Sequence, residues 1–164
     1  MLKKDKIILG FDPGIADTGW GLISKNNQSL RFIAAGSIKT AKGKKFSSRL
    51  EIIYQEVDEL IKKYQPDIVA VEKLFFAKNA KTALDVGQAR GVLLLAIIKN
   101  NKEILEFTPL QIKQAVCANG QAAKKQVGLM VKAILKLTAV PQPDDAADGL
   151  ATAITASFFN KNIA

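Results

Sequence analysis

The sequence predicts a single α/β domain, spanning residues 1–164, in which a mixed sheet of five strands is flanked by helices. Short, continuous apolar runs are typical of strands buried on both faces, whereas apolar residues three and four positions apart are typical of amphipathic helices. These two kinds of segment succeed one another along the chain, without a Ser/Gly-rich linker or an internal repeat. A length of 164 residues fits one domain, since domains usually contain about 100 to 200 residues.

The N-terminal half predicts three strands followed by a helix. Ile7–Phe11 is a continuous apolar run, as expected of a buried strand. Gly19–Ser24 and Leu30–Ile38 predict the next two strands, and the polar segment between them predicts a turn, so these strands should be antiparallel. Apolar residues at helical spacing predict an amphipathic helix over Phe46–Tyr64, which should end before Pro66.

The C-terminal half predicts two more strands and four helices. Asp67–Val71 and Ile104–Phe107 have the pattern of buried strands, and Thr82–Lys99 predicts a long helix that is apolar on most sides. Strands joined through a helix usually run parallel, so the sheet should be mixed. Three further helices are expected: one opening at Thr108-Pro109, where threonine suits the N-cap and proline the first turn, one over about Ala122–Leu137, and one from Pro143-Asp144 through Phe159.

The composition excludes several kinds of site and favours a polyanionic partner. The chain has no histidine and one cysteine, Cys117, which excludes an imidazole base, a zinc site with histidine ligands and an internal disulfide. It has 24 Lys and Arg against 15 Asp and Glu, a net charge of +9, which favours nucleic acid. Because only Arg31, Arg49 and Arg90 are arginines, contacts with the DNA backbone are favoured over reading of base edges. The alternative is that the basic charge serves solubility alone.

Two segments bear on location. The longest apolar run, Val92–Ile98, is far shorter than the roughly 20 residues of a membrane span. The charged N-terminal segment Met1–Lys6 lacks the pattern of a secretory signal. The expected location is therefore the cytoplasm.

Acidic residues stand at the ends of otherwise apolar elements. Asp12 follows the run ILGF, and Glu72 follows the run IVAV. If these two strands are adjacent and parallel, their ends lie about 5 Å apart at one edge of the sheet. Asp145 and Asp148 lie three residues apart at the start of an apolar helix, so they share a face and can approach the same point.

Converging carboxylates repel each other unless their pKa values rise or a cation lies between them. In a chain with these residue types, Mg²⁺ is the expected cation and Mn²⁺ an expected substitute. Two such ions can activate a water for phosphodiester hydrolysis. Each acid also has a structural interpretation: Asp12 could cap the Pro-Gly turn, Glu72 could pair with Lys73, and Asp144 and Asp145 could cap the last helix.

Five motifs, in this order and spacing, resemble the RuvC family of bacterial Holliday-junction resolvases: ILGFDPGIADTGWGLI, VAVEKLFFAKNAKTALDVGQARG, QIKQAV, GQAAKKQV and PDDAADGLATAI. The resemblance covers nearly the whole chain. It implies a ribonuclease H-like fold, a homodimer and a Mg²⁺-dependent endonuclease that resolves four-way DNA junctions by paired symmetric nicks in recombination and repair. It also implies a RuvA–RuvB branch-migration complex as a partner.

The resemblance also assigns roles to single residues. Asp12 and Glu72 match the first two catalytic and metal-binding carboxylates of the family, and Asp145 and Asp148 match the closing pair, although some members have histidine at the position of Asp145. Phe75 matches an aromatic that stacks on bases at the opened junction, with packing inside its own loop as the alternative. The residues expected to contact DNA are Phe75, Lys78, Lys81, Lys113 and Lys124.

Two residues depart from the family pattern, and one helix bears on the implied homodimer. Ala118 stands where members commonly have glycine, and Ala123 where an acidic residue is frequent, so loop geometry and the charge near Lys124 are expected to differ. The helix Thr82–Lys99 is apolar on more sides than a small monomer can cover. A homodimer interface and a central core helix explain this equally well.

Two other classes of function compete with a resolvase. A junction-binding protein without catalysis would not need carboxylates that face phosphates. An actin- or sugar-kinase-like ATPase also has an Asp-x-Gly phosphate loop after its first strand, but that architecture needs two such domains, and this length has room for one. Binding of ATP at micromolar concentration would favour the ATPase.

Overall fold

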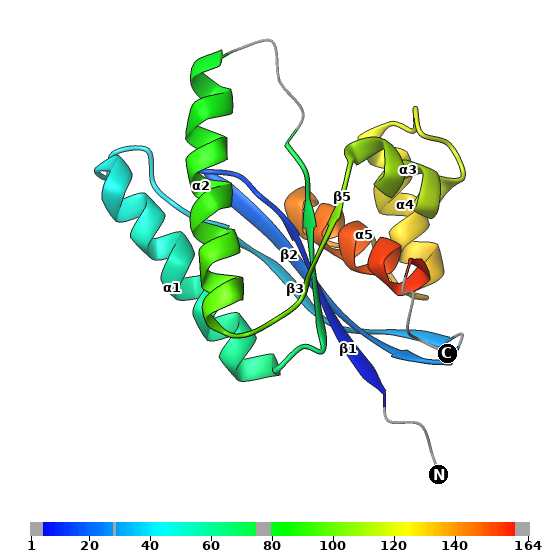
Figure 1. Ribbon diagram of the computed structural model, residues 1–164. Helices are drawn as coiled ribbons and strands as arrows, with labels where there is room; N and C mark the ends of the chain where they lie inside the picture. Colours follow the sequence, from blue (N-terminus) through cyan, green and yellow to red (C-terminus); the bar gives the residue numbers. More distant parts are fainter. Residues whose placement is uncertain (1–4, 28, 75–79, 160–164) are drawn as a thin grey trace.

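A computed structural model of the protein describes residues 5–27, 29–74 and 80–159. One five-stranded sheet with the strand order β3-β2-β1-β4-β5 forms its centre (Figure 1). The strands are β1 (Lys6–Asp12), β2 (Asp17–Asn26), β3 (Ser29–Lys39), β4 (Ile68–Glu72) and β5 (Ile104–Phe107). The helices are α1 (Phe46–Tyr64), α2 (Ala80–Lys99), α3 (Pro109–Cys117), α4 (Lys124–Ile134) and α5 (Asp144–Phe158).

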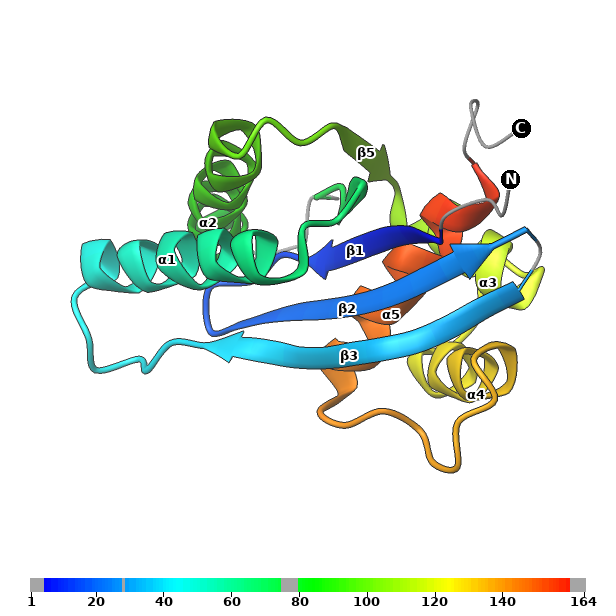
Figure 2. The same ribbon diagram turned by 90° about the horizontal axis from the view of Figure 1, so that it is seen from below.

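The sheet is mixed, as the sequence predicts. β1 pairs antiparallel with β2 and parallel with β4, and β5 extends the parallel half. Helices α1 and α2 cover one face, whereas α3, α4 and α5 lie on the other, with α5 against the middle of the sheet (Figures 1 and 2). The five-stranded α/β fold class is therefore confirmed, whereas one domain over the whole of 1–164 stays a prediction.

The helix ends follow from local chemistry. Thr108 caps α3 as predicted: its hydroxyl oxygen accepts a hydrogen bond from the backbone N–H of Gln111 at 3.2 Å, and the Gln111 side chain accepts from Thr108 N–H at 2.8 Å. Helix α4 is shorter than predicted at both ends. It begins after Ala123, which has an extended backbone, and ends before Lys136, whose φ of 53° is left-handed.

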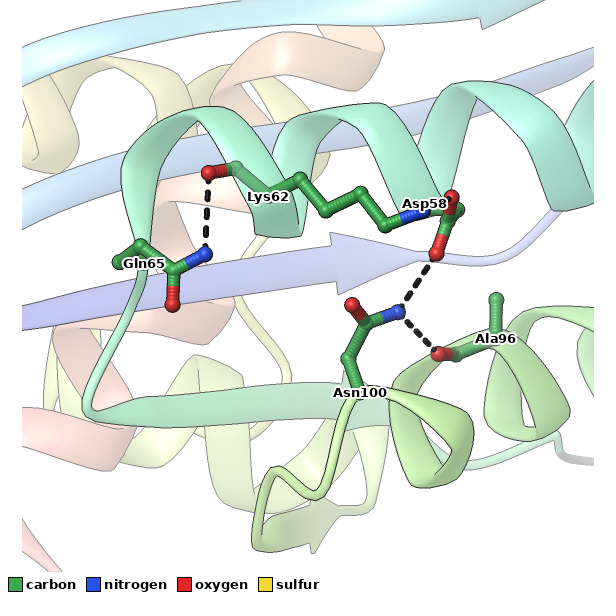
Figure 3. A network of polar contacts seen from close by, with 5 residues as sticks. All are labelled: Asp58, Lys62, Gln65, Ala96 and Asn100. Carbon is green, nitrogen blue, oxygen red and sulfur yellow. Dashed lines mark hydrogen bonds and ion pairs between the residues drawn. The ribbon is translucent and has the colours of Figure 1, made fainter.

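A polar network fastens α1 to α2 (Figure 3). Asn100, just beyond α2, donates to Asp58 of α1 at 2.7 Å and to the backbone carbonyl of Ala96 at 2.8 Å. Lys62 of α1 pairs with the same Asp58 at 2.6 Å. Helix α2 therefore has a fixed position relative to α1, which matters because the loop that follows Glu72 leads into α2.

Helix α5 approaches the sheet more closely than side chains on the sheet would permit. A Cβ atom on Gly10, Gly19 or Gly21 of the sheet would collide with backbone atoms of α5. In the opposite direction, a Cβ on Gly149 of α5 would lie 2.5 Å from Cα of Trp20. These four glycines let the backbones of α5, β1 and β2 touch, and they thereby place the start of α5 beside the end of β1.

One departure from the family pattern has a visible structural consequence. Ala118 ends α3 with φ 53° and ψ 20°, in the left-handed region where a side chain is disfavoured. We expect Ala118→Gly to raise the free energy of unfolding by about 1 kcal/mol, measured by urea denaturation, because glycine has no Cβ penalty there. Ala115→Gly inside α3 is the matched control and should lower it by about as much. Equal effects of both substitutions would contradict this interpretation.

Candidate active site

Two of the four predicted carboxylates meet at the ends of parallel strands. Asp12 is the last residue of β1 and Glu72 the last residue of β4, and the register pairs Phe11 with Val71 directly before them. The two side chains line the same cleft, where the negative charge of Asp12 contributes to the raised pKa of Glu72. The expected approach of the strands is therefore confirmed, and Glu72 faces Asp12.

Helix α5 brings the other two carboxylates to the same place. Carboxylate oxygens of Asp12, Asp145 and Asp148 all lie within 4.8 Å of one another. Glu72 lies outside this group of three, although it lines the same cleft as Asp12. Asp144, the first residue of α5, is exposed and is not a member of the group, in agreement with a role at the helix end.

The cleft beside these carboxylates has a volume of about 260 Å³. Its acidic walls are Asp12, Glu72 and Asp148, and α3 and α4 supply Lys113 and Lys124. Lys124 Nζ lies 2.8 Å from Asp148 and 3.6 Å from Asp145, and its side chain is about half exposed. The site thus combines a carboxylate group with two lysines at the rim, where they can contact an anionic substrate.

The acids have perturbed pKa values because the strand ends and α5 bury them together. Burial, followed by the negative charge of Asp148, raises the pKa of Asp12 to about 6. Burial, followed by the charge of Asp12, raises the pKa of Glu72 to about 8. Burial also raises the pKa of Asp148, although Lys124 acts against this shift, and the hydrogen bond to Asp148 raises the pKa of Lys124.

The raised carboxyl pKa values reflect burial first and repulsion between the neighbouring acids second, and both would be offset by a bound cation. The donors are carboxylate oxygens, which hard divalent cations prefer. The residues present therefore fit a divalent metal, with Asp12, Asp145 and Asp148 as the group of oxygens close enough to share an ion and Glu72 directly beside it.

The structure bears on the structural alternatives for two of the acids, whose catalytic roles stay predictions. The Pro-Gly turn after β1 is held by Thr18, whose hydroxyl donates to the carbonyl of Gly14 at 2.7 Å, so Asp12 is left to face the cleft. Asp145 pairs with Lys124 across the site, which a helix-capping role alone does not explain.

The predicted DNA-contacting residues lie in different parts of the chain, and the structure does not describe all of them. Lys113 and Lys124 line the cleft, as expected of residues near a scissile phosphate. Phe75 and Lys78 lie outside the described residues. Lys81 belongs to the first turn of α2. The roles of all five residues in DNA binding stay predictions.

Sequence reasoning missed one residue that supports the site. Arg90 of α2 donates from Nε to the backbone carbonyl of Glu72 at 3.3 Å and forms an ion pair with Glu106 of β5. It therefore joins the end of β4, where Glu72 stands, to both α2 and β5. Arg90 lies in the motif GQARG and is one of only three arginines in the chain, which could have drawn attention to it. A sequence pattern does not show, however, which side chain donates to a given backbone carbonyl.

Comparison with known proteins places this geometry in a family. The family described as crossover junction endodeoxyribonuclease RuvC matches residues 8–156. The chain belongs to this RuvC family. Among curated relatives, RuvC of Natranaerobius thermophilus is 54% identical over 148 residues, which cover 90% of this chain and 92% of that protein. RuvC of Clostridioides difficile is 48% identical over 155 residues, with coverage of 94% and 92%.

Solved structures agree with the sequence relatives. T. thermophilus RuvC in complex with a Holliday junction substrate superposes with a TM-score of 0.84 at 33% identity, covering 94% of each chain. The yeast mitochondrial Holliday junction resolvase Ydc2 has a TM-score of 0.66 at 16% identity, over 94% of this chain and 80% of that one, a likeness of fold alone. The RuvC chain described here therefore has the ribonuclease H-like fold that the resemblance implied.

Proposed function

We propose that the carboxylate cleft is the site at which this crossover junction endodeoxyribonuclease nicks four-way DNA, and that Mg²⁺ is its cofactor. The observation that carries the proposal is the group of Asp12, Asp145 and Asp148 oxygens within 4.8 Å, with Glu72 beside Asp12. Mn²⁺ is expected to substitute, because it accepts the same oxygen ligands. We expect two ions during catalysis, as in other phosphodiester hydrolyses between carboxylates.

The proposal assigns a separate role to each group of residues. Asp12, Glu72, Asp145 and Asp148 would hold the metal, which when bound supplies an activated water and a positive charge at the leaving oxygen. Lys113 and Lys124 would position the phosphate from the rim of the cleft, where both stand. Phe75 would stack on a base at the opened junction, with Lys78 and Lys81 as phosphate partners.

The test of this function is strand mapping. A synthetic four-way junction and a linear duplex of the same sequence would be incubated with the protein, with Mg²⁺ or with a chelator. Paired, symmetric nicks on the junction alone, and only with Mg²⁺, are the expected result. Binding without nicks in any divalent metal would instead support a junction-binding protein without catalysis.

The raised carboxyl pKa values predict how stability depends on pH. The native state without metal keeps protons on Asp12 and Glu72 up to about pH 6 and 8, whereas the unfolded chain releases them near the ordinary values of 3.8 and 4.5. The native state therefore binds more protons between about pH 4 and 8, and its free energy of unfolding should fall as pH rises through this window. Thermal unfolding from pH 5 to 8.5 measures this slope.

Addition of Mg²⁺ and the variant Glu72→Gln distinguish the contribution of the buried acids to this pH dependence from the contributions of other charged groups. Mg²⁺ binds the ionised acids of the native state, so it should restore thermal stability most at the alkaline end of the range. Glu72→Gln should flatten the pH dependence without metal, whereas Glu103→Gln, an exposed acid before β5, should not. Identical slopes for the wild type and Glu72→Gln would contradict the assignment of the pKa shift.

We also propose that the protein acts as a homodimer through the outer face of α2. One side of this helix is buried on the sheet, but Leu84, Leu95 and Ile98 are 68%, 52% and 59% exposed. With the exposed Gln88 and Gly91 they form a stripe at spacings of four and three residues, the pattern of a helix-to-helix seam. A second copy presents the same stripe, so a two-fold pairing buries both.

Leu95→Glu is expected to convert the dimer into monomers. It would place two like charges near the two-fold axis, where such a juxtaposition costs several kcal/mol. Sedimentation velocity measures the change in mass, and Leu129→Glu, on the exposed side of α4, is the control that should remain dimeric. A wild-type protein that is monomeric at micromolar concentration would contradict the proposed dimer.

Two further expectations concern the cell. We propose a RuvA–RuvB branch-migration complex as partner by family resemblance, and the cytoplasm as location because of the sequence features described above. None of the helices that the structure describes is long and apolar enough to cross a membrane. Pull-down of purified RuvA and RuvB on junction DNA tests the partner.

A further inference from the structure

A second hollow lies at the edge of the sheet, away from the carboxylate cleft. It has a volume of about 530 Å³ and is bounded by the first residues of β3, the end of α4 and the end of α5. We call it the β3 recess and define it by Leu30, Arg31, Phe32, Leu135, Lys136 and Phe158. No step proposed for nicking uses any of these residues.

The β3 recess is open to solvent and combines apolar with polar surface. Phe32 is 42% and Phe158 57% exposed, a degree of exposure that is uncommon for such large apolar side chains outside binding surfaces. Ile33, which bulges out of the ladder between β2 and β3 directly after Phe32, is 39% exposed. The recess therefore exposes apolar surface that a partner could cover.

The wall of the recess is also a free strand edge. β3 is the outermost strand and pairs on one side only, with β2. Its first four residues, Ser29 to Phe32, are in regular register before the bulge, so their outward backbone groups can form a ladder with a further strand. A strand added there would direct every second side chain to the face on which the recess lies.

The charges of the recess select an acidic partner. Its two charged side chains, Arg31 and Lys136, are both basic, and they stand on opposite walls, one on β3 and one beyond α4. We propose that the β3 recess binds an extended, acidic peptide segment of a partner protein, which adds a strand to β3 and inserts apolar side chains between Phe32 and Phe158.

Junction DNA fits this surface less well. Through the strand register, Phe32 lies level with Ile8, four residues before Asp12 on β1, which corresponds to roughly 13 Å along the strands. It is also two strands further out in the sheet. A phosphate backbone gains little from exposed phenylalanines, whereas an apolar side chain in an acidic peptide would use both features of the recess.

The proposal is tested with a display library of random twelve-residue peptides. Selection on the full chain would take place with excess four-way junction DNA, which occupies the nucleic-acid-binding surfaces. Enrichment of acidic peptides with alternating apolar residues is the expected result. In fluorescence anisotropy, these peptides should bind the variants Phe32→Asp and Arg31→Glu at least tenfold more weakly than the wild type, and the control Leu129→Asp as tightly as the wild type.

Nicking of the junction and thermal unfolding should be unchanged in the Phe32 and Arg31 variants, which shows that they fold. The proposal would be overturned by an absence of enriched acidic peptides, by equal binding to the wild type and the variants, or by binding only after removal of residues 160–164. Loss of self-association in Phe32→Asp would point to a second copy as the occupant and would overturn it as well.

Discussion

Replacing Asp12 by asparagine is expected to abolish nicking of a four-way junction, while junction binding stays unchanged or becomes tighter. Asp12 lines the cleft with Glu72 and has an oxygen within 4.8 Å of oxygens of the pair on α5, so its loss would remove a ligand from the centre of the proposed metal site. A loss of several kcal/mol of stabilisation of the transition state corresponds to a rate that is roughly 10³-fold lower. Single-turnover nicking with Mg²⁺ measures the rate, and a gel-shift assay with a chelator, in which no divalent ion bridges the acids and the phosphate, measures binding.

The direction of the binding effect separates a catalytic role from a structural one. Removing a negative charge that faces phosphates cannot weaken their attraction, so weaker binding would indicate a misfolded variant instead. Asp144→Asn is the matched control, because it makes the same chemical change at an exposed position at the start of α5. It should nick at close to the wild-type rate. Residual nicking by Asp12→Asn at the rate of this control would refute the assignment.

Local patterns explain how much of the fold could be predicted. The strands β1, β4 and β5 are short apolar runs, and Thr108 with Pro109 marks the start of α3, so each could be placed from neighbouring residues. The errors lie at element ends. Helix α4 is shorter than its apolar pattern because Lys136 adopts a left-handed backbone, a choice that tertiary packing makes.

The candidate site could be predicted where it depends on strand ends. Asp12 and Glu72 follow apolar runs, and parallel pairing brings such ends together. Helical spacing predicts that Asp145 and Asp148 share a face and can approach the same point. Their position relative to Asp12, however, depends on contact between α5 and the sheet, which no local pattern gives. The same holds for Arg90, whose partner is a backbone carbonyl on another element.

The structure gives the long helix α2 two different faces. The sequence favoured a core helix and a dimer helix equally, since apolar residues occur on most sides. Leu93, Ala96 and Ile97 are buried against the sheet, whereas Leu95 and Ile98 are exposed. The core interpretation therefore holds for one side of the helix, whereas the dimer interpretation stays a proposal for the exposed side.

Adding a single methyl group at Gly149 is expected to inactivate the site without touching any carboxylate. The Cβ of Gly149→Ala would lie 2.5 Å from Cα of Trp20 and 2.7 Å from the backbone nitrogen of Gly21. Backbone atoms in the centre of a sheet cannot move aside as a side chain can, so α5 must shift away from it. Such overpacking costs typically 1–3 kcal/mol, and thermal unfolding should show this loss.

The shift of α5 matters more for nicking than for folding. Asp148 immediately precedes Gly149, so the displaced helix carries Asp145 and Asp148 away from Asp12, and a misplacement of about 1 Å can lower a rate roughly 10²-fold. Gly43→Ala is the matched control, because its Cβ would meet nothing within 4 Å. Nicking under single-turnover conditions should therefore fall about 100-fold in Gly149→Ala and stay unchanged in Gly43→Ala. If a folded Gly149→Ala protein nicked at the wild-type rate, the metal-binding carboxylates would not depend on close contact between α5 and the sheet.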